Sequence, residues 1–194
     1  KRTYMIKLIS YFLQSLIIYF FFFISLILRL NLSRRFFALV FSFFGPLFKS
    51  KKIIEKNLEN FNLKKNNFKK EEIISEMWKN YGMTFVEYMF LNKFRKNKSH
   101  VILEGEENLN EILKNEKPVI FVSGHFANYE LMSMEITKKN IKLATIYRPL
   151  NNIFLNPLME FLRKKYVCKN QIKKGINGVR DTLEYLRKNY SIAL

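Results

Sequence analysis

The segment His-Phe-Ala-Asn-Tyr-Glu, residues 125–130, places an imidazole and a carboxylate five positions apart. A carboxylate beside a histidine fixes its tautomer and stabilises the imidazolium, so His125 and Glu130 could act together as a general base. In a continuous helix, positions five apart diverge by about 140°. The pair can therefore meet only if His125 lies in the turn before a helix and Glu130 in its first turn, which Gly124 and a helix cap at Asn128 would allow. The spacing alone is equally compatible with a helix-capping histidine and a glutamate at the favourable end of the helix dipole.

The elements around this segment place it at the edge of a sheet. Residues 119–123 form a short apolar run that predicts a buried parallel strand, and residues 128–139 carry Leu131, Met134 and Ile136 on one side of a predicted helix. Open α/β sheets bind their ligands at the carboxyl ends of the strands. We therefore expect His125 and Glu130 to lie where such a sheet would hold a substrate.

The second half of the chain alternates between strand and helix patterns. This alternation predicts an α/β fold, with a parallel or mixed sheet covered by helices. We expect strands at residues 101–103, 119–123, 143–147 and 191–194, and helices at 108–114, 128–139, 154–166 and 176–189. In the last helix, Val179, Leu183 and Leu186 have the spacing of a core face.

Residues 49–100 differ in character from this second half. We expect an amphipathic helix at 51–58, a loop at 66–68, a long helix over 71–90 and a basic turn at 93–98. The aromatic residues of the long helix have core spacing, so we interpret that face as packing rather than as a substrate groove.

Four blocks of sequence, in order, resemble the lipid A biosynthesis acyltransferases of the lysophospholipid acyltransferase superfamily. Residues 123–130 resemble the family's Gly-His-Phe-Gly-Asn-Trp-Glu segment, with Ala127 in place of a glycine and Tyr129 in place of a tryptophan. The other three blocks are Glu-Gly-Glu-Glu-Asn-Leu at 104–109, Tyr-Arg-Pro-Leu-Asn-Asn at 147–152 and Gly-Val-Arg at 178–180. The resemblance extends from the first apolar helix to the last residue.

The resemblance implies a reaction and a set of site residues. It implies transfer of a fatty acyl group from an acyl carrier protein thioester to a hydroxyl of a lipid A precursor, a phosphorylated glucosamine lipid. His125 and Glu130 would form the general-base pair, and no cofactor or metal would be needed. The substrate-binding residues would be Arg148, which could clamp a phosphate through its guanidinium fork, and three further residues: Asn128, Asn151 and Arg180. It also implies a bacterial inner-membrane protein with its catalytic domain at the cytoplasmic face.

The start of the chain predicts a membrane anchor. Residues 8–28 carry no charge, and as a helix they would extend about 31 Å, close to the hydrocarbon thickness of about 30 Å. We expect this helix to span a membrane or to be deeply embedded in it; a buried core helix is the alternative. Residues 36–48 are too short to span, and the Gly45-Pro46 pair predicts an interfacial hairpin or shoulder.

These observations predict two parts. Residues 1–48 would be the membrane anchor and interfacial segment, and residues 49–194 the acyltransferase domain. The chain stops within its last predicted strand, and its only aspartate is Asp181. We therefore expect the acyltransferase domain to be truncated at its carboxyl end, with an aspartate-containing block of the family lying beyond Leu194.

The charge favours a lipid partner over nucleic acid. The formal net charge is +18, but the lysines are dispersed and no base-reading motif accompanies them. The first 50 residues hold seven Lys or Arg and no acid, together with the longest apolar run, which suits anionic lipid. An acidic carrier protein would also suit this basic chain.

Other chemistries lack the residues that they require. A single cysteine, Cys168, excludes disulfides and zinc ribbons within the chain, and two distant histidines exclude a three-histidine metal site. Ser123 lacks the Gly-x-Ser-x-Gly frame of a nucleophile elbow, and no glycine-rich phosphate loop is present. Two alternatives stay open: a superfamily acyltransferase acting on a glycerolipid or glycosylated lipid, and a non-enzymatic, basic, membrane-tethered binding module.

Overall fold

The structure, a computed structural model, describes residues 2–48, 51–59, 69–97 and 100–194. The chain divides into two compact units, one made of Lys1–Tyr19 with Leu91–Leu194 and the other of Phe20–Phe90. The sequence predicts a different kind of division, between a membrane anchor at residues 1–48 and an acyltransferase domain at residues 49–194. That division by function remains a prediction.

A parallel sheet organises the first unit. Within the described residues it has four strands in the order β1-β4-β2-β3. All the pairings are parallel, with Ile192 opposite both Ile120 and Ala144. The strands are β1 (Ile120–Phe121), β2 (Leu143–Tyr147), β3 (Asn170–Lys173) and β4 (Ser191–Ala193). The expected α/β class is therefore confirmed, and the sheet is parallel rather than mixed.

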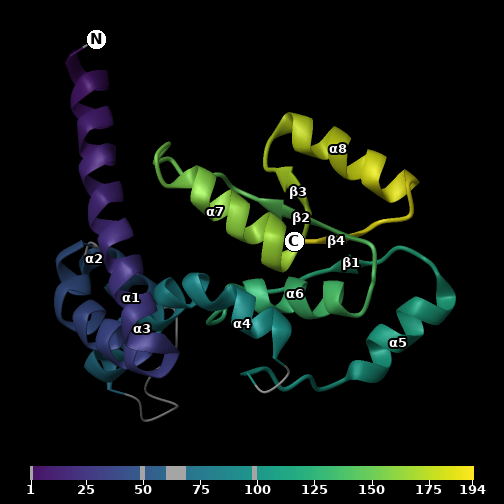
Figure 1. The fold of residues 1–194 in the computed structure, drawn as a ribbon, viewed down its shortest axis with the longest axis horizontal. Helices are drawn as coiled ribbons and strands as arrows, with labels where there is room; N and C mark the ends of the chain where they lie inside the picture. Colours follow the sequence, from purple (N-terminus) through teal and green to yellow (C-terminus); the bar gives the residue numbers. More distant parts are fainter. Residues whose placement is uncertain (1, 49–50, 60–68, 98–99) are drawn as a thin grey trace. The chain divides into compact units, whose positions relative to one another are not determined.

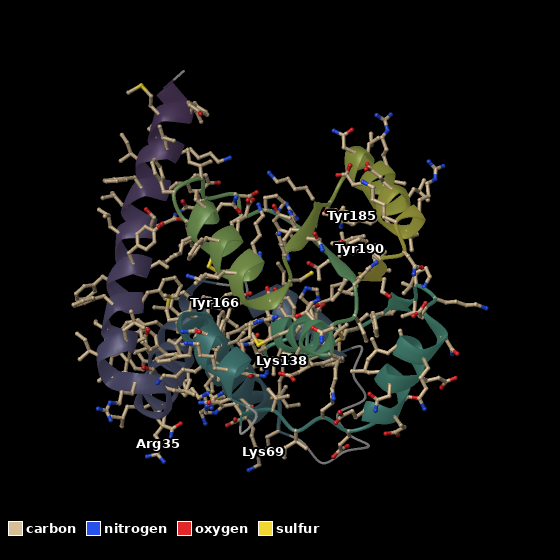
Figure 2. The ribbon with its side chains drawn as sticks, turned by 45° about the vertical axis from the view of Figure 1, so that its right-hand side comes forward. Arg35, Lys69, Lys138, Tyr166, Tyr185 and Tyr190 are labelled. Carbon is tan, nitrogen blue, oxygen red and sulfur yellow. The ribbon has the colours of Figure 1, made fainter. Side chains whose placement is uncertain are left out.

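Helices cover both faces of this sheet (Figure 1). α8 packs on one face, where Tyr185 and Leu186 meet a core of Ala144, Ile172 and Ile192, and α6 packs on the other face. The rings of Tyr185 and Tyr190 meet edge to face, with 5.2 Å between their centroids. Figure 2 labels both residues, which lie on α8 and directly before β4. The helices of this unit are α4 (Leu91–Lys96), α5 (Glu106–Asn115), α6 (Glu130–Lys138), α7 (Asn156–Leu162) with a π-helical turn η4 (Arg163–Val167), and α8 (Ile176–Arg187).

Gly178 lets α8 approach the sheet closely. A β-carbon at this position would lie 2.2 Å from the carbonyl oxygen of Lys173, at the end of β3. A contact that short with backbone cannot be relieved by a side-chain rotation. The first residue of the Gly-Val-Arg block therefore has a packing role.

The long helix α1 (Arg2–Phe48) begins in the first unit and ends in the second. It is interrupted at Arg29, whose backbone is non-helical with φ 62° and ψ 171°. The buried hydroxyl of Ser33 lies 2.7 Å from the carbonyl oxygen of Ser25 and 2.6 Å from that of Arg29, so it satisfies backbone acceptors at the interruption. The sequence predicted the break at Gly45-Pro46 instead. That prediction is wrong, because the helix continues through both residues to Phe48.

The second unit is helical in its described residues. Besides its part of α1, it contains α2 (Lys51–Glu59), α3 (Lys70–Glu87) and the 3₁₀ turn η2 (Tyr88–Phe90). Phe85 of α3 contacts an aromatic cluster on α1, stacking on Phe22 at 4.8 Å between ring centroids. Arg34 of α1 donates to Glu87 at 2.8 Å. The predicted core role of the α3 aromatics is confirmed at Trp78, which is buried, and at Phe85 through its ring contacts, whereas Tyr81 is half exposed.

Other sequence predictions need correction. Residues 101–103 do not form a strand, whereas β3 had not been predicted. The strand predicted as buried at 119–123 is limited to Ile120–Phe121, and Ile120 is exposed. Most of the predicted basic turn at 93–98 is helix α4, because Leu91 and Phe94 are fully buried and anchor that turn of helix. The expected loop at 66–68 lies outside the described residues. On α8, Val179 and Leu183 are exposed and only Leu186 of the predicted stripe contacts the core.

The apolar character of α1 is confirmed. Among the described residues, it is the one helix long and apolar enough to cross a membrane, over Thr3–Leu47. Most of its apolar stretch is exposed in the structure: 17% of the most apolar 18 residues are buried. This exposure agrees with a membrane-associated helix better than with a buried core helix.

We expect Gly178→Ala to destabilise the protein by about 1–3 kcal/mol, the usual cost of overpacking, despite the better helix propensity of alanine. Thermal unfolding in detergent, followed by circular dichroism, measures the change. Asn177→Ala is the matched control, because Asn177 is exposed on the same helix. Equal unfolding temperatures for the two variants would contradict the packing role of Gly178.

Candidate active site

A cavity of about 380 Å³ opens at the carboxyl edge of the sheet. Its walls come from the residues that follow β1, β2 and β3, from the end of β4 and from the first turn of α6. Three of the residues predicted from the sequence, His125, Glu130 and Arg148, line this one cavity. They come from separate segments, and the parallel strands bring them together as expected for ligand sites in α/β folds.

The other three predicted residues lie elsewhere. Asn128 is buried beneath the turn before α6, and its carbonyl oxygen accepts from the amide of Leu131. The helix cap itself is Tyr129, not Asn128 as predicted. Asn151 and Arg180 are exposed, and neither belongs to the cavity lining.

A buried ion pair fixes Glu130. Arg163 Nε donates to Glu130 Oε1 at 2.6 Å, and both side chains are 9% exposed. A buried charge requires such a partner, because an uncompensated carboxylate in this environment would cost several kcal/mol, of the order of 3–5. The guanidinium also lies over the ring of Tyr147, with 6.0 Å between its central carbon and the ring centroid.

Arg163 was not identified from the sequence, although a signal was present. It follows Leu155 and Met159 at four-residue spacing, which places it on the helix side that is buried. A charged residue at core spacing needs a buried partner of opposite charge. In the structure Arg163 opens the π-helical turn, where the amide of Cys168 bonds to the carbonyl oxygen of Arg163 at 3.0 Å.

A hydrogen-bond network holds the segment after β2. Tyr147 Oη donates to Glu160 Oε1 at 2.7 Å, and Asn156 Nδ2 donates to the same oxygen at 2.9 Å. Asn156 Oδ1 in turn accepts from the amide of Leu150 at 2.8 Å. Burial and the bond to Glu160 raise the pKa of Tyr147 to about 12. The hydrogen bonds from Tyr147 and Asn156 lower the pKa of Glu160, so the pair stays a phenol and a carboxylate at neutral pH. The bonds at Tyr147 and at Leu150 therefore hold the backbone of Arg148, which lies between these two residues.

The last residue of the Tyr-Arg-Pro-Leu-Asn-Asn block is structural. Asn152 is buried; its Oδ1 accepts from the amides of Phe154 and Leu155, and its Nδ2 donates to the carbonyl oxygen of Tyr11. Within this block, the cavity-lining residues are therefore Tyr147 and Arg148.

The imidazole of His125 is exposed to the cavity and packs against an aromatic ring. Its centroid lies 4.4 Å from that of Tyr129. Between them Ala127 adopts φ 44°, in the left-handed region that glycine occupies readily. This backbone conformation gives a physical reason for the glycine in the family pattern at this position.

A second cation at the cavity had also been missed. Lys174 follows β3 and lines the cavity together with Arg148, and its amide bonds to the carbonyl oxygen of Tyr147 at 2.8 Å. It was missed because β3 was not predicted, so the strand end that presents Lys174 was not recognised. Two exposed cations at one cavity suit a phosphate-bearing ligand.

Metal and thiol chemistry find no support in the part of the chain that the structure describes. No group of three or more His, Cys, Asp or Glu is placed to hold a metal ion among those residues. Cys168 is buried, and burial raises the pKa of its thiol, which disfavours the reactive thiolate.

We expect Arg163→Met to lower the free energy of unfolding by about 3–5 kcal/mol, because it leaves Glu130 buried without its counter-charge. Denaturant unfolding measures the effect. Lys164→Met is the control: its Nζ lies 3.7 Å from Glu160 and its side chain is 52% exposed, so the expected loss is below about 1 kcal/mol. The double variant Glu130→Leu/Arg163→Met should recover much of the loss. A double variant as unstable as Arg163→Met alone would contradict the ion-pair explanation.

We expect Ala127→Gly to stabilise the protein by about 1 kcal/mol, because glycine relieves the left-handed backbone at that position. Ala38→Gly, within the helical part of α1, should have the opposite sign, since glycine weakens a helix. The midpoints of thermal unfolding measure both. Destabilisation by Ala127→Gly would show that the turn before α6 differs from the one described.

Comparison with known proteins adds to this geometry. The family model described as bacterial lipid A biosynthesis acyltransferase matches residues 1–194. Neither the search of curated proteins nor the search of solved structures gave a match. Because the family model covers the whole chain, this protein belongs to the bacterial lipid A biosynthesis acyltransferase family.

Proposed function

We propose that the protein transfers a fatty acyl chain from an acyl carrier protein thioester to a hydroxyl of a phosphorylated glucosamine lipid, with His125 as the general base. The single observation that carries this proposal is the cavity that His125, Glu130 and Arg148 share. Family membership supplies the class of reaction, since it implies an acyltransferase. The donor, the acceptor and the base pair are our assignments.

The chemistry follows from the residues at the cavity. The acceptor hydroxyl donates a hydrogen bond to the imidazole of His125 and attacks the thioester carbonyl as its proton passes to the ring. The new ester C–O bond forms, the C–S bond breaks, and the leaving thiolate recovers the proton. No covalent enzyme intermediate is required.

Glu130 would orient His125 and stabilise the imidazolium. Its Oε1 accepts from Arg163, and we assign the contact with the imidazole to this anchored carboxylate. A carboxylate anchored in this way loses little conformational entropy when the imidazole turns toward it. Arg163 is then a positioning residue, acting through Glu130 rather than on the substrate.

Arg148 and Lys174 would bind the phosphate of the acceptor or of the carrier's prosthetic arm. Both are exposed at the cavity, and the guanidinium can form two parallel bonds to a phosphate. The acidic surface of a carrier protein would complement a chain of net charge +18. We place the protein at the bacterial inner membrane with this cavity on the cytoplasmic side, held there by α1, and we assign it no nucleic-acid partner.

We expect His125→Ala to reduce acyl transfer by about 10²–10⁴-fold, the usual loss on removal of a general base. Mass spectrometry of the acylated lipid, with acyl carrier protein thioester as donor, measures the rate and identifies the acceptor. His100→Ala is the control, because His100 packs against Phe94 away from the cavity lining. If the acylated product forms only from a glycerolipid or a glycosylated lipid, that lipid is the acceptor and the proposed acceptor is wrong. Full activity in His125→Ala would show that His125 is not the base, and no acyl transfer by the wild-type protein would favour a binding module over an enzyme.

We expect Arg148→Lys to raise the KM for the phosphorylated acceptor about tenfold, because lysine cannot reproduce the bidentate contact, worth roughly 1.5 kcal/mol. The value of kcat should change much less. Arg180→Lys is the matched substitution on α8, outside the cavity lining. A larger rise in KM for Arg180→Lys than for Arg148→Lys would show that the phosphate binds outside this cavity.

A further inference from the structure

The first half of α1 has one covered side and is otherwise bare. Ser15 is buried and Leu8, Tyr11 and Ile18 are half-buried, and these four residues follow one another at three- or four-residue spacing along one side of the helix. Large apolar side chains without such a covered position surround the rest of this stretch and are exposed: Tyr4, Met5, Ile6, Ile9, Leu13, Leu16 and Ile17. The helix therefore has an apolar surface much wider than the side that the protein covers.

The covered side is held by the loop that follows β2. Asn152 Nδ2 donates to the carbonyl oxygen of Tyr11 at 2.8 Å, and Tyr19 Oη donates to the carbonyl oxygen of Phe154 at 2.6 Å. The rings of Phe12 and Phe154 meet edge to face at 5.4 Å. These contacts attach the loop after β2 to the uncharged part of the helix, and not to the charged residues at the start of the helix.

This attachment conflicts with a helix that crosses the bilayer. Along the helix axis, Tyr11 lies about 6 Å and Tyr19 about 18 Å beyond Lys7. In a spanning helix both would lie within the hydrocarbon, and the irregular loop bonded to them would lie there as well. Irregular backbone exposed to lipid is not found at that depth, because its polar groups would have no partners. A helix lying in the membrane surface has one side toward the aqueous domain and avoids this conflict.

The bare side has the chemistry of a lipid contact. Contiguous exposed apolar surface of this extent is unusual in water. The first 50 residues carry seven Lys or Arg and no acid, which suits an anionic leaflet. On the loop itself, Leu150 and Ile153 are 36% and 55% exposed, on either side of the buried Asn152.

We propose that the first half of α1 lies in the plane of an anionic membrane surface rather than across the bilayer, and that Leu150 and Ile153 enter the same lipid layer. Arg148 precedes Leu150 by two residues, so the loop would hold its guanidinium at the level of the lipid headgroups. The proposal concerns how the protein binds the membrane. It stands apart from the reaction, and its test does not use activity.

Single cysteines in the full chain test both parts of the proposal. The native Cys168 is buried with a raised pKa, so an exposed introduced thiol reacts selectively. Thr3→Cys reports the start of α1, and Asn110→Cys reports the exposed side of α5 in the same unit. A membrane-impermeant maleimide is applied to right-side-out spheroplasts and to inverted membrane vesicles.

The depth of the loop is measured separately. A fluorophore on Ile153→Cys is followed in phosphatidylethanolamine–phosphatidylglycerol vesicles with nitroxide-labelled acyl chains, which quench fluorophores that enter the lipid layer. Asn110→Cys and Ile176→Cys are the controls, and residue 176 is 93% exposed on α8.

The proposal predicts that Thr3→Cys and Asn110→Cys react from the same side of the membrane. It also predicts that the fluorophore at residue 153 is quenched, with a blue shift, while those at residues 110 and 176 are not. Labelling of residues 3 and 110 from opposite sides would show that α1 crosses the bilayer and would overturn the proposal. Quenching at residue 153 no greater than at residues 110 and 176 would overturn the lipid contact of the loop, as expected if a second copy of the protein covers the bare side.

Discussion

The buried pair between Glu130 and Arg163 is the interaction on which the cavity depends. It joins the first turn of α6 to the π-helical turn after α7, two elements that lie on different walls of the cavity. Removal of either charge would leave the other buried without this counter-charge, at a cost of several kcal/mol. The pair therefore selects a packing in which the Glu130 carboxylate is fixed in the lining of the cavity that His125 also lines. The bond of Tyr147 to Glu160, on the same helix α7, fixes the Arg148 segment in a similar way.

Local sequence predicted three residues of the cavity, His125, Glu130 and Arg148, but it also predicted Asn128, Asn151 and Arg180, which lie outside the cavity lining. The apolar runs before His125 and Arg148 predicted β1 and β2, and hence that these two residues would share one edge of the sheet, although the apolar run at 101–103 forms no strand. Arg163 and Lys174 were missed. The role of Arg163 arises from a carboxylate 33 positions away, and Lys174 follows a polar strand, Asn170–Lys173, whose hydrophobic pattern is too weak to reveal it.

The same distinction applies to the fold. The strand at 143–147 and the start of the helix at 176 were predicted correctly, since both have a strong pattern and clear ends. The break in α1 was predicted at Gly45-Pro46 from local propensity. It occurs at Arg29, where the Ser33 hydroxyl satisfies the backbone acceptors of the interruption. A side chain eight residues from its acceptor at Ser25 can stabilise such a break, and propensity rules do not include that contact.

We infer that His125 is the base and that the anchored Glu130 makes it effective. Chemical rescue tests it most directly, because the His125→Gly variant leaves space at an exposed position of the cavity for free imidazole. We predict that imidazole restores acyl transfer in His125→Gly, in proportion to the concentration of its neutral form, and that rescue is lost when Glu130→Gln is added. A His125→Gly variant that transfers acyl chains at the wild-type rate without imidazole would contradict the account.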